Sequence, residues 1–392
     1  MPLNKISNNA MDRVSKEMKV LIEDPDVMFD VHCHIFNFDF VPNGYLGIRI
    51  PFTHKFFKGL ENLLHRIISS RDTDVLSNIA YFIKFGRTRS TIDIAKKLFS
   101  YYGQKTIFCP LMMDMQPKKH RGIKGKLKID FPQQMNKMKQ VMNKTPDKVL
   151  PFVAIDPRRD NVFNDIFLKG FSFDYNFFGI KIYPCLGYMP SHPELMRIFE
   201  VCEDKNIPVI AHCSGASVKS SYHYLRNIEG IRRINENHET KYKKFKENKW
   251  LLRRQSYARY FNNPRNWEPV LHSFPRLRLD LGHFGGDKEW MMFLKGKTNT
   301  WVSRIIDLIY RYDNVYADIS FNIYNHKTND LLRKLLENNK RLAERTLYGS
   351  DFYMVVVKGH FRCIKTDFMV IMGDRIIYQI ASVNPKKFLG LN

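Results

Sequence analysis

The sequence has no segment typical of secretion or of membrane insertion. Residues 1–25 contain neither an apolar core nor a small-residue cleavage site. No uninterrupted apolar run approaches the roughly 18 residues that a membrane-spanning helix needs. The six cysteines form no CxxC pair, and several stand in apolar runs such as TIFCPLM, which favours buried, reduced thiols. These absences predict a cytoplasmic protein.

Acidic residues are scarce relative to basic ones, and this is the abnormal feature of the composition. There are 39 Asp and Glu against 63 Lys and Arg, which gives a net charge of +24. Such a charge can attract nucleic acid, an anionic surface or an acidic small molecule. The alternative is a lysine-rich background that is simply solvated. The charge therefore leaves nucleic acid open as a partner.

Eight short apolar or β-branched runs recur along the chain, and most are followed by an amphipathic stretch. Apolar strands that alternate with helices predict an α/β fold with a parallel sheet covered on both faces. Eight such units in 392 residues fit a (β/α)8 barrel. An open doubly wound sheet would usually show a glycine-rich loop after its first strand, but HCHIFN contains no glycine. The expected strands span 27–35, 105–112, 149–155, 178–183, 207–212, 276–283, 314–320 and 345–351.

Two intervals are much longer than the usual spacing between expected strands, one after the first strand and one after the fifth. We interpret the segments at about 35–104 and 218–262 as insertions with helices inside one barrel domain that spans residues 1–392. Loops that follow barrel strands lie on the catalytic face, so both insertions should form a lid. The basic segments 117–128 and 232–254 should lie on the same face and would favour an anionic substrate. The tail SVNPKKFLGL should form a closing helix.

Histidines and one aspartate stand where several of these strands end. His32 and His34 are two residues apart on the first strand, so their side chains should face the same way, with Cβ atoms about 6–7 Å apart. Cys33 between them should face the surrounding helices. HxH alone is a weak signal in a chain with 13 histidines. However, His212, His283 and Asp351 also end strands, and barrel enzymes place their catalytic groups at that end. The pattern predicts a metal site.

With these residues in place, the chain resembles the amidohydrolase superfamily, and within it the amidohydrolase-related group of hydrolases and decarboxylases. The segments that carry the resemblance are FDVHCH, VLPFVAIDPRR, GIKIYPCLGYMP, IPVIAHCS, WEPVLHSFPRLRLDLGHFGG, NVYADIS, TLYGSDF and NPKKFLGL. They follow the family order from about residue 28 to the C-terminus, whereas the two insertions match no member that we can name.

The resemblance implies a metal centre and assigns roles to its residues. His32, His34, His212 and Asp351 would hold one divalent metal, commonly Zn²⁺, with Mn²⁺ or a second metal as alternatives. Metal-bound hydroxide would attack the substrate, with Asp351 as the proton carrier and His283 as the polarising or acid-base group. Lys181, Tyr183 and Arg158 are the expected substrate-binding residues. Lys181 could instead be carboxylated and bridge two metals, but we favour the free amine bound to a substrate carboxylate.

Three functions remain open from the sequence. The first is hydrolysis of an ester, lactone or amide of an anionic small molecule. The second is non-oxidative decarboxylation of an aromatic or unsaturated acid by the same residues. The third, from another class, is a nucleic-acid-binding barrel with a vestigial site. A homodimer is also open, and no membrane partner is expected.

Overall fold

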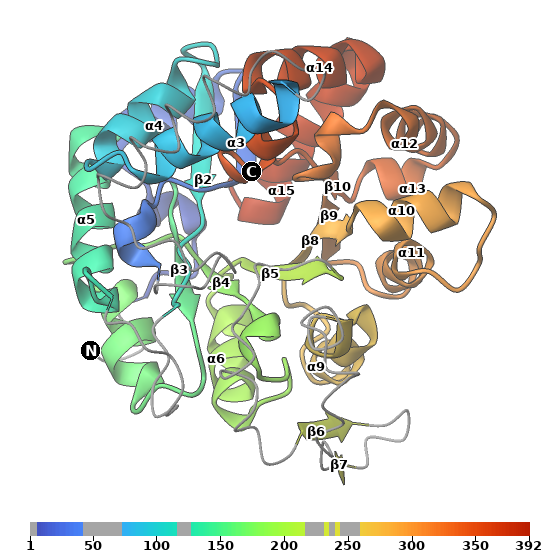
Figure 1. Ribbon diagram of the computed structural model, residues 1–392. Coiled ribbons are helices and arrows are strands. Elements are labelled where there is room, and N and C mark those ends of the chain that lie inside the picture. Colours follow the sequence, from blue (N-terminus) through green and yellow to red (C-terminus); the bar gives the residue numbers. More distant parts are fainter. Residues whose placement is uncertain (1–5, 42–72, 116–126, 216–230, 235–239, 244–258) are drawn as a thin grey trace.

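The computed structural model is a closed barrel of eight parallel strands (Figure 1). It describes residues 6–41, 73–115, 127–215, 231–234, 240–243 and 259–392. Two strands form one sheet and six form a second, in the order β10-β9-β8-β5-β4-β3. The barrel strands are β1 (Met28–Cys33), β2 (Thr106–Pro110), β3 (Phe152–Ile155), β4 (Gly179–Ile182), β5 (Val209–Ser214), β8 (Leu279–Gly285), β9 (Val315–Asp318) and β10 (Thr346–Leu347). All eight lie within or overlap the runs expected from the sequence.

Irregular backbone contacts close the barrel at the two places where the ladders stop. Between β2 and β3, isolated parallel bridges pair Phe108 with Val149 and Leu111 with Phe152. Between β1 and β10, the amide of Val31 donates to the Tyr348 carbonyl, and the amide of Asp351 donates to the His32 carbonyl at 2.7 Å. The strands therefore form one circle, and the fold is the expected (β/α)8 barrel.

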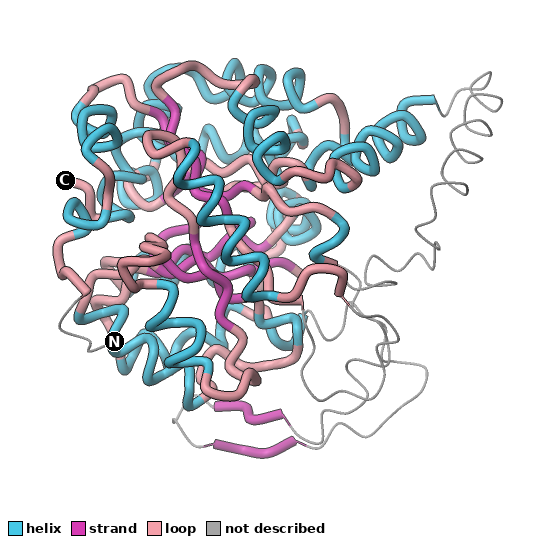
Figure 2. Tube along the Cα trace, turned by 90° about the vertical axis from the view of Figure 1, so that its left-hand side faces the viewer, coloured by secondary structure: helices cyan, strands magenta, loops and turns pink. Residues whose placement is uncertain are grey.

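Helices surround the strands on the outside, as both views of the chain show (Figures 1 and 2). An additional short antiparallel pair, β6 (Ile231–Ile234) and β7 (Thr240–Lys243), lies apart from the barrel. The helices are α1 (Lys16–Glu23), α3 (Thr73–Gly86), α4 (Thr91–Phe99), α5 (Phe131–Lys144), α6 (Pro193–Asp204), α9 (Glu268–Ser273), α10 (Asp287–Leu294), α11 (Trp301–Arg311), α12 (His326–Asn338), α13 (Lys340–Ala343), α14 (Phe361–Tyr378) and α15 (Asn384–Leu389).

Local sequence signals explain where several helices begin and end. Asp130 caps α5 in a reciprocal capping box with Gln133, and Thr300 caps α11 by accepting a hydrogen bond from the amide of Ser303. Gly390 ends α15 in the left-handed conformation, with φ at 70°. These short-range signals fix helix ends without help from the barrel.

Two hydrophobic clusters form the core. The cluster inside the barrel contains Phe29, Val31, Ile107 and Ile210, and it continues into α1 and α15. Phe388 and Leu389 of α15 belong to it, so the tail closes the amino-terminal end of the barrel, as its sequence predicts. The second cluster lies between the strands and the outer helices, and Cys33 packs there with Ile94 and Leu98 of α4. Cys33 thus faces the helices, away from the barrel centre.

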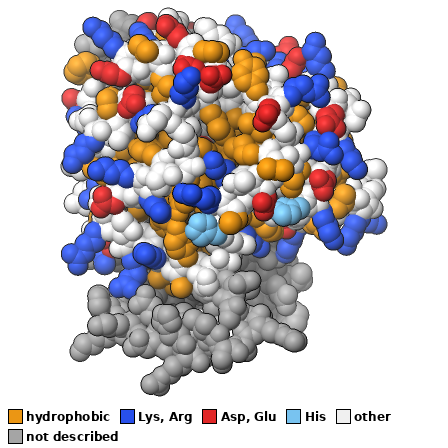
Figure 3. All heavy atoms as spheres, turned by 90° about the horizontal axis from the view of Figure 1, so that it is seen from above, with side chains coloured by type: hydrophobic (Ala, Val, Ile, Leu, Met, Phe, Trp, Pro, Cys, Tyr) orange, Lys and Arg blue, Asp and Glu red, His pale blue; other side chains and the backbone are white. Residues whose placement is uncertain are grey.

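The expected lid lies largely outside the described residues. Residues 42–72, 216–230, 235–239 and 244–258 of the two insertions are not described, nor is most of the two basic segments. The described part of the first insertion includes α3, which packs on the short helix η8 (Met354–Lys358) after β10. On the face seen from above, Lys and Arg side chains are spread among acidic ones (Figure 3). No helix among the described residues is long and apolar enough to cross a membrane.

Candidate metal centre

Three predicted ligands meet at the carboxyl end of the barrel. His32 and His34 come from β1, and Asp351 follows β10, the neighbouring strand in the circle. One nitrogen or oxygen atom from each of the three lies within 4.8 Å of the others, and all three side chains are buried. His34 Nε2 is 3.2 Å from Asp351 Oδ1, and His34 Nδ1 is 3.0 Å from the Leu111 carbonyl. Two imidazoles and one carboxylate at this spacing are a ligand set that suits zinc or manganese.

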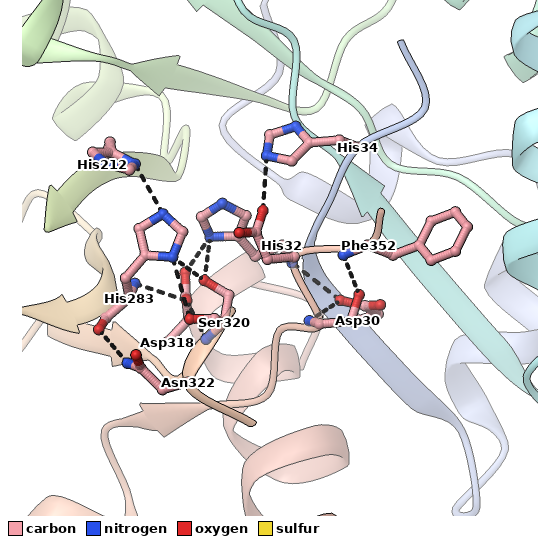
Figure 4. Close-up of polar contacts among 11 residues, drawn as sticks. Asp30, His32, His34, His212, His283, Asp318, Ser320, Asn322 and Phe352 are labelled. Atoms are coloured by element: carbon pink, nitrogen blue, oxygen red, sulfur yellow. Dashed lines mark hydrogen bonds and ion pairs between the residues drawn. The ribbon is translucent and has the colours of Figure 1, made fainter. Parts of the chain in front are cut away.

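His32 is oriented by a carboxylate behind it. Its Nδ1 is 2.7 Å from Asp318 Oδ2 and 3.0 Å from the Ser320 hydroxyl (Figure 4). Its Nε2 is buried and has no hydrogen-bond partner among the described residues. Burial lowers the pKa of His32 to about 3, although the charge of Asp318 opposes this shift. A neutral imidazole with an unused nitrogen, held by a carboxylate, is the usual state of a metal ligand.

His283 and His212 form the second part of the site. His283 Nε2 lies 2.8 Å from His212 Nδ1, and His283 Nδ1 lies 2.9 Å from the Ser320 hydroxyl (Figure 4). His283 can also be grouped with His32 and Asp318 at ligand distances, whereas His212 belongs to neither such group. Burial lowers the pKa of His283. The structure thus brings all four predicted histidines together, with His212 directed at His283.

The first and last strands are tied together directly beside these ligands. The buried carboxylate of Asp30 accepts hydrogen bonds from the amide of Ser350 at 2.9 Å and from the Tyr102 hydroxyl at 3.0 Å. A Cβ atom at Gly349 would lie 2.6 Å from the Cβ of His32, so this close approach requires glycine. The tie places Asp351 next to His32 and His34.

Strained backbone is concentrated at the same place. Seven described residues other than glycine have a positive φ, and three of them are asparagines, which tolerate it. The other four are His283, Phe284, Phe321 and Asp351. Such conformations persist only where the surrounding structure holds them, and they gather at functional sites.

A cavity of about 280 Å³ opens onto the candidate metal ligands. The Nζ atom of Lys181 is buried and has no hydrogen-bond partner among the described residues. The Tyr183 ring stands edge-on to His212 at 4.6 Å. Phe82 of α3 and Met354 and Val357 of η8 supply apolar walls. The lining consists of His32, His34, Phe82, Met113, Lys181, Tyr183, His212, Ser214, His283, Gly286, Asp287, Phe321, Asn322, Asp351, Met354 and Val357.

Arg158 is the expected substrate-binding residue that the structure does not bring to the cavity. Its guanidinium pairs with Asp156, donates to the Leu186 carbonyl at 2.6 Å and lies over the Tyr188 ring. Arg158 is not among the residues that line the cavity. These contacts point to a role in holding the loops after β3 and β4.

Sequence analysis missed Asp318, the carboxylate that orients His32. Asp318 ends β9 within the segment NVYADIS, which the sequence predicts as a strand. Its position at a strand end is the signal that could have identified it. Its role could not be inferred, because strand-end aspartates are also common as caps and turns. Asp30 was missed in the same way, although it stands inside FDVHCH.

Comparison with known proteins supports the fold and the family. The family model described as amidohydrolase matches residues 140–391, more than half of the chain. No curated protein matches the chain in sequence. Among solved structures, an uncharacterised TIM-barrel protein from Bordetella bronchiseptica is similar, with 14% identity, a TM-score of 0.54, and coverage of 93% of this chain and 99% of that one.

Two decarboxylases are similar in fold at comparable levels. A dihydroxybenzoic acid decarboxylase from a Polaromonas species, solved with bound manganese and the inhibitor 2-nitroresorcinol, has 12% identity and a TM-score of 0.51, with coverage of 93% and 97% of the two chains. A 2,6-dihydroxybenzoate decarboxylase from Rhizobium has 16% identity and a TM-score of 0.50, with coverage of 93% and 99%. At these identities the likeness concerns the fold alone.

Proposed function

Because the chain belongs to the amidohydrolase family and is an enzyme of that superfamily, we propose that it is a metal-dependent hydrolase acting on an ester, lactone or amide of an anionic small molecule. The observation that carries the proposal is the buried group of His32, His34 and Asp351 within ligand distance of one another. The unused Nε2 of His32 supports it, because a buried imidazole nitrogen without a partner is costly unless a ligand satisfies it.

The proposed ligands are His32, His34, His212 and Asp351, with zinc favoured and manganese as the alternative. His212 would join them by exchanging its hydrogen bond with His283 for the metal. When bound, the metal would supply Lewis-acid activation of water or of the substrate carbonyl. We propose one metal per chain, because both oxygens of Asp318 already accept hydrogen bonds, so this residue orients His32 and is left out of the ligand set.

Asp351 and His283 are the proposed acid-base residues. Burial alone would raise the pKa of Asp351, but the hydrogen bond from His34 holds that pKa below its usual value. Asp351 is therefore ionised at neutral pH and can accept a proton. His283 is neutral there because burial lowers its pKa, so it can donate a hydrogen bond to a substrate oxygen without repelling a cation.

Lys181 is the proposed anchor for a substrate carboxylate. Its Nζ lies in the cavity wall without a partner among the described residues, and burial lowers its pKa to about 8. The amine is thus still mostly protonated at pH 7, and an anionic substrate group would satisfy it. Tyr183 would contact the same substrate from the edge of the cavity.

A decarboxylase acting on an aromatic or unsaturated acid is the second candidate. The observation that favours it is the apolar part of the cavity, where Phe82, Phe321 and Met113 face the same space as Lys181. A flat ring with a carboxylate would fit such a wall. The metal ligands and His283 would be the same in both reactions.

The test combines metal analysis with turnover. We expect one zinc or manganese per chain, with loss of both metal and turnover in His34→Gln and no change in the exposed control His326→Gln. A panel of lactones, esters and hydroxybenzoates, monitored by acid release and by CO2 release, separates the two reactions. Intact mass should show no added carboxyl group on Lys181. Failure to bind any metal under metal-replete conditions would remove the basis of the proposal.

A further inference from the structure

Asp280 of β8 is a buried acid to which neither the sequence nor the proposed reaction gives a role. Its side chain is 0% exposed. Among the described residues, no N–H or hydroxyl group forms a hydrogen bond of standard geometry with either of its oxygens. An ionised carboxylate in such a place would be very costly, because nothing replaces the water that it loses.

Asp280 lies inside the barrel, in the same layer as Lys181. In the parallel ladders Lys181 pairs with Ile210, and Ile210 pairs with Asp280. Residues paired in this way point to the same side of a sheet, and Ile210 belongs to the cluster that fills the barrel. Both ionisable side chains therefore face the interior, on either side of an isoleucine.

The carboxyl group of Asp318 faces that of Asp280, because Asp280 pairs with Tyr316 in the β8–β9 ladder and Asp318 lies two residues further along the same side of β9. The two carboxyl groups influence each other's pKa through a hydrogen bond. Two carboxylates accept hydrogen bonds but cannot donate them, so this contact requires one proton between the pair. Asp318 already accepts from the amides of His283 and Ser320, at 3.0 and 2.9 Å, and from His32 Nδ1. The proton therefore belongs on Asp280, whose one backbone contact of this kind, with the amide of Asp318, is the smallest of the influences on its pKa.

The electrostatics agree with this assignment. Burial and the charge of Asp318 raise the pKa of Asp280 well above its usual value. Burial would raise the pKa of Asp318 too, but His32 and the hydrogen bond from Asp280 hold it well below. The other titratable groups that interact with Asp280 are Lys181 and the thiols of Cys109 and Cys213. The positive charge of Lys181 then faces Asp318 and Asp351, and a substrate anion can use it.

We propose that Asp280 is a positioning residue that acts as a neutral carboxylic acid, donating a hydrogen bond to Asp318 and thereby holding Asp318 on His32. The resulting chain of contacts runs from Asp280 to Asp318 to His32, and from there to the metal. The part of the proposal that concerns the metal rests on the proposed function, in which His32 is a ligand. Asp280 itself touches neither metal nor substrate.

Two substitutions separate a neutral donor from the alternatives. Asp280→Asn keeps a donor toward Asp318 and cannot ionise, whereas Asp280→Leu has no donor. Zinc affinity, measured by competition with a chromophoric chelator, should stay within about 3-fold of wild type in Asp280→Asn. It should fall by about 10- to 100-fold in Asp280→Leu, the usual effect of losing an outer-shell partner of a metal ligand.

A second readout does not depend on metal binding. In metal-free protein labelled with ¹⁵N-histidine, NMR should show His32 protonated at Nδ1 in the wild type and in Asp280→Asn, and a mixture of tautomers in Asp280→Leu. Equal losses of zinc affinity in both variants would show that an ionised Asp280 is required, and unchanged affinity and tautomer in Asp280→Leu would show that it positions nothing. Either result overturns the proposal. If the wild type binds no zinc, the proposed function fails, and the tautomers alone decide the role of Asp280.

Discussion

The two ends of the barrel each carry a cavity, and the larger one is at the end without the candidate metal centre. The cavity at the amino-terminal end measures about 520 Å³ and is lined by Arg13, Ser15, Lys139, Asp174 and Tyr175 among others. The cavity over the metal centre measures about 280 Å³. At the larger one, the two terminal nitrogens of the Arg13 guanidinium donate to the carbonyls of Phe178 and Asn206 at 3.2 and 2.9 Å, and its Nε has no partner among the described residues.

Size therefore does not distinguish the two ends, but the state of their polar groups does. Unsatisfied buried atoms of His32, Lys181 and Asn322 lie at the smaller cavity, against one, the Nε of Arg13, among the described residues at the larger. Three strained residues, His283, Phe321 and Asp351, also line the smaller cavity. Among the residues that line the larger cavity, the non-glycine residue with a positive φ is Asn176, and asparagine tolerates this conformation. Unsatisfied polar atoms and strained backbone cost stability, so their concentration at one end marks the end where function maintains them.

The largest contrast between the two ends should come from one chemical change made at each. Asp351→Asn keeps the shape of the side chain but removes the negative ligand and the proton acceptor, and we expect turnover to fall by about 10³-fold or more. Asp174→Asn makes the same change in the larger cavity and should leave turnover within 2-fold. Steady-state kinetics on the substrate found for the wild type measures both. Equal losses would remove the distinction between the two ends.

Acid should lower the stability of the protein through protonation of His32, at the carboxyl end of the barrel. The folded-state pKa of His32 is lowered to about 3, below its ordinary value of 6.5, so its neutral form favours folding above pH 6.5 and that contribution is lost as the pH falls toward 3. Between pH 7 and pH 4.5, the unfolding free energy of the metal-free wild type should fall by about 2–3 kcal/mol more than that of His32→Gln. Burial raises the pKa of Asp30 to about 6, which acts in the opposite direction but is common to both proteins.

Urea denaturation at the two pH values gives that difference. A difference that does not change with pH would mean that His32 is not buried in its neutral form. Arg13 at the other end keeps its charge throughout this range, because burial lowers its pKa only to about 10.

The smallest effect is expected at the amino-terminal end. Arg13→Met keeps the apolar stem but leaves the carbonyls of Phe178 and Asn206 without their donor, and we expect a loss of about 1–2 kcal/mol in unfolding free energy. The specificity constant kcat/KM should stay within 2-fold of wild type. Lys139→Met, in the same cavity, should change the stability by less than about 0.5 kcal/mol. A large fall in turnover with Arg13→Met would instead couple the two ends.

The sequence predicts the barrel well because its signals are local and repeated. Each strand is a short apolar run, so GIKIY and IPVIAH could be placed without knowledge of their neighbours. The same holds for His32, His34 and Asp351, whose positions at strand ends bring them together once the circle closes. The tail helix was likewise predicted from Asn384-Pro385 and the apolar residues that follow.

The contacts that the sequence could not predict depend on register and on the direction of single side chains. Arg158 follows β3 as expected, yet a carboxylate two residues earlier takes its guanidinium away from the cavity. Asp318 and Asp280 stand in strands that were placed correctly, but their alignment follows from ladder pairings that no local pattern encodes. His212 ends its strand as predicted, and only the folded arrangement shows it directed at His283.

The hydrogen bond from the Ser350 amide to Asp30 joins the last strand to the first, so the order of synthesis matters for this site. Asp30 and Ser350 are 320 residues apart, and the residues proposed to bind the metal come from both of these segments. A nascent chain exposes His32 and His34 long before it gains Asp351, their carboxylate partner. During synthesis the early histidines could hold a metal only loosely, so firm binding would report that the circle of strands has closed. Under the proposed function, capture of the metal follows closure of the circle, and a chain that stops before Asp351 cannot complete it.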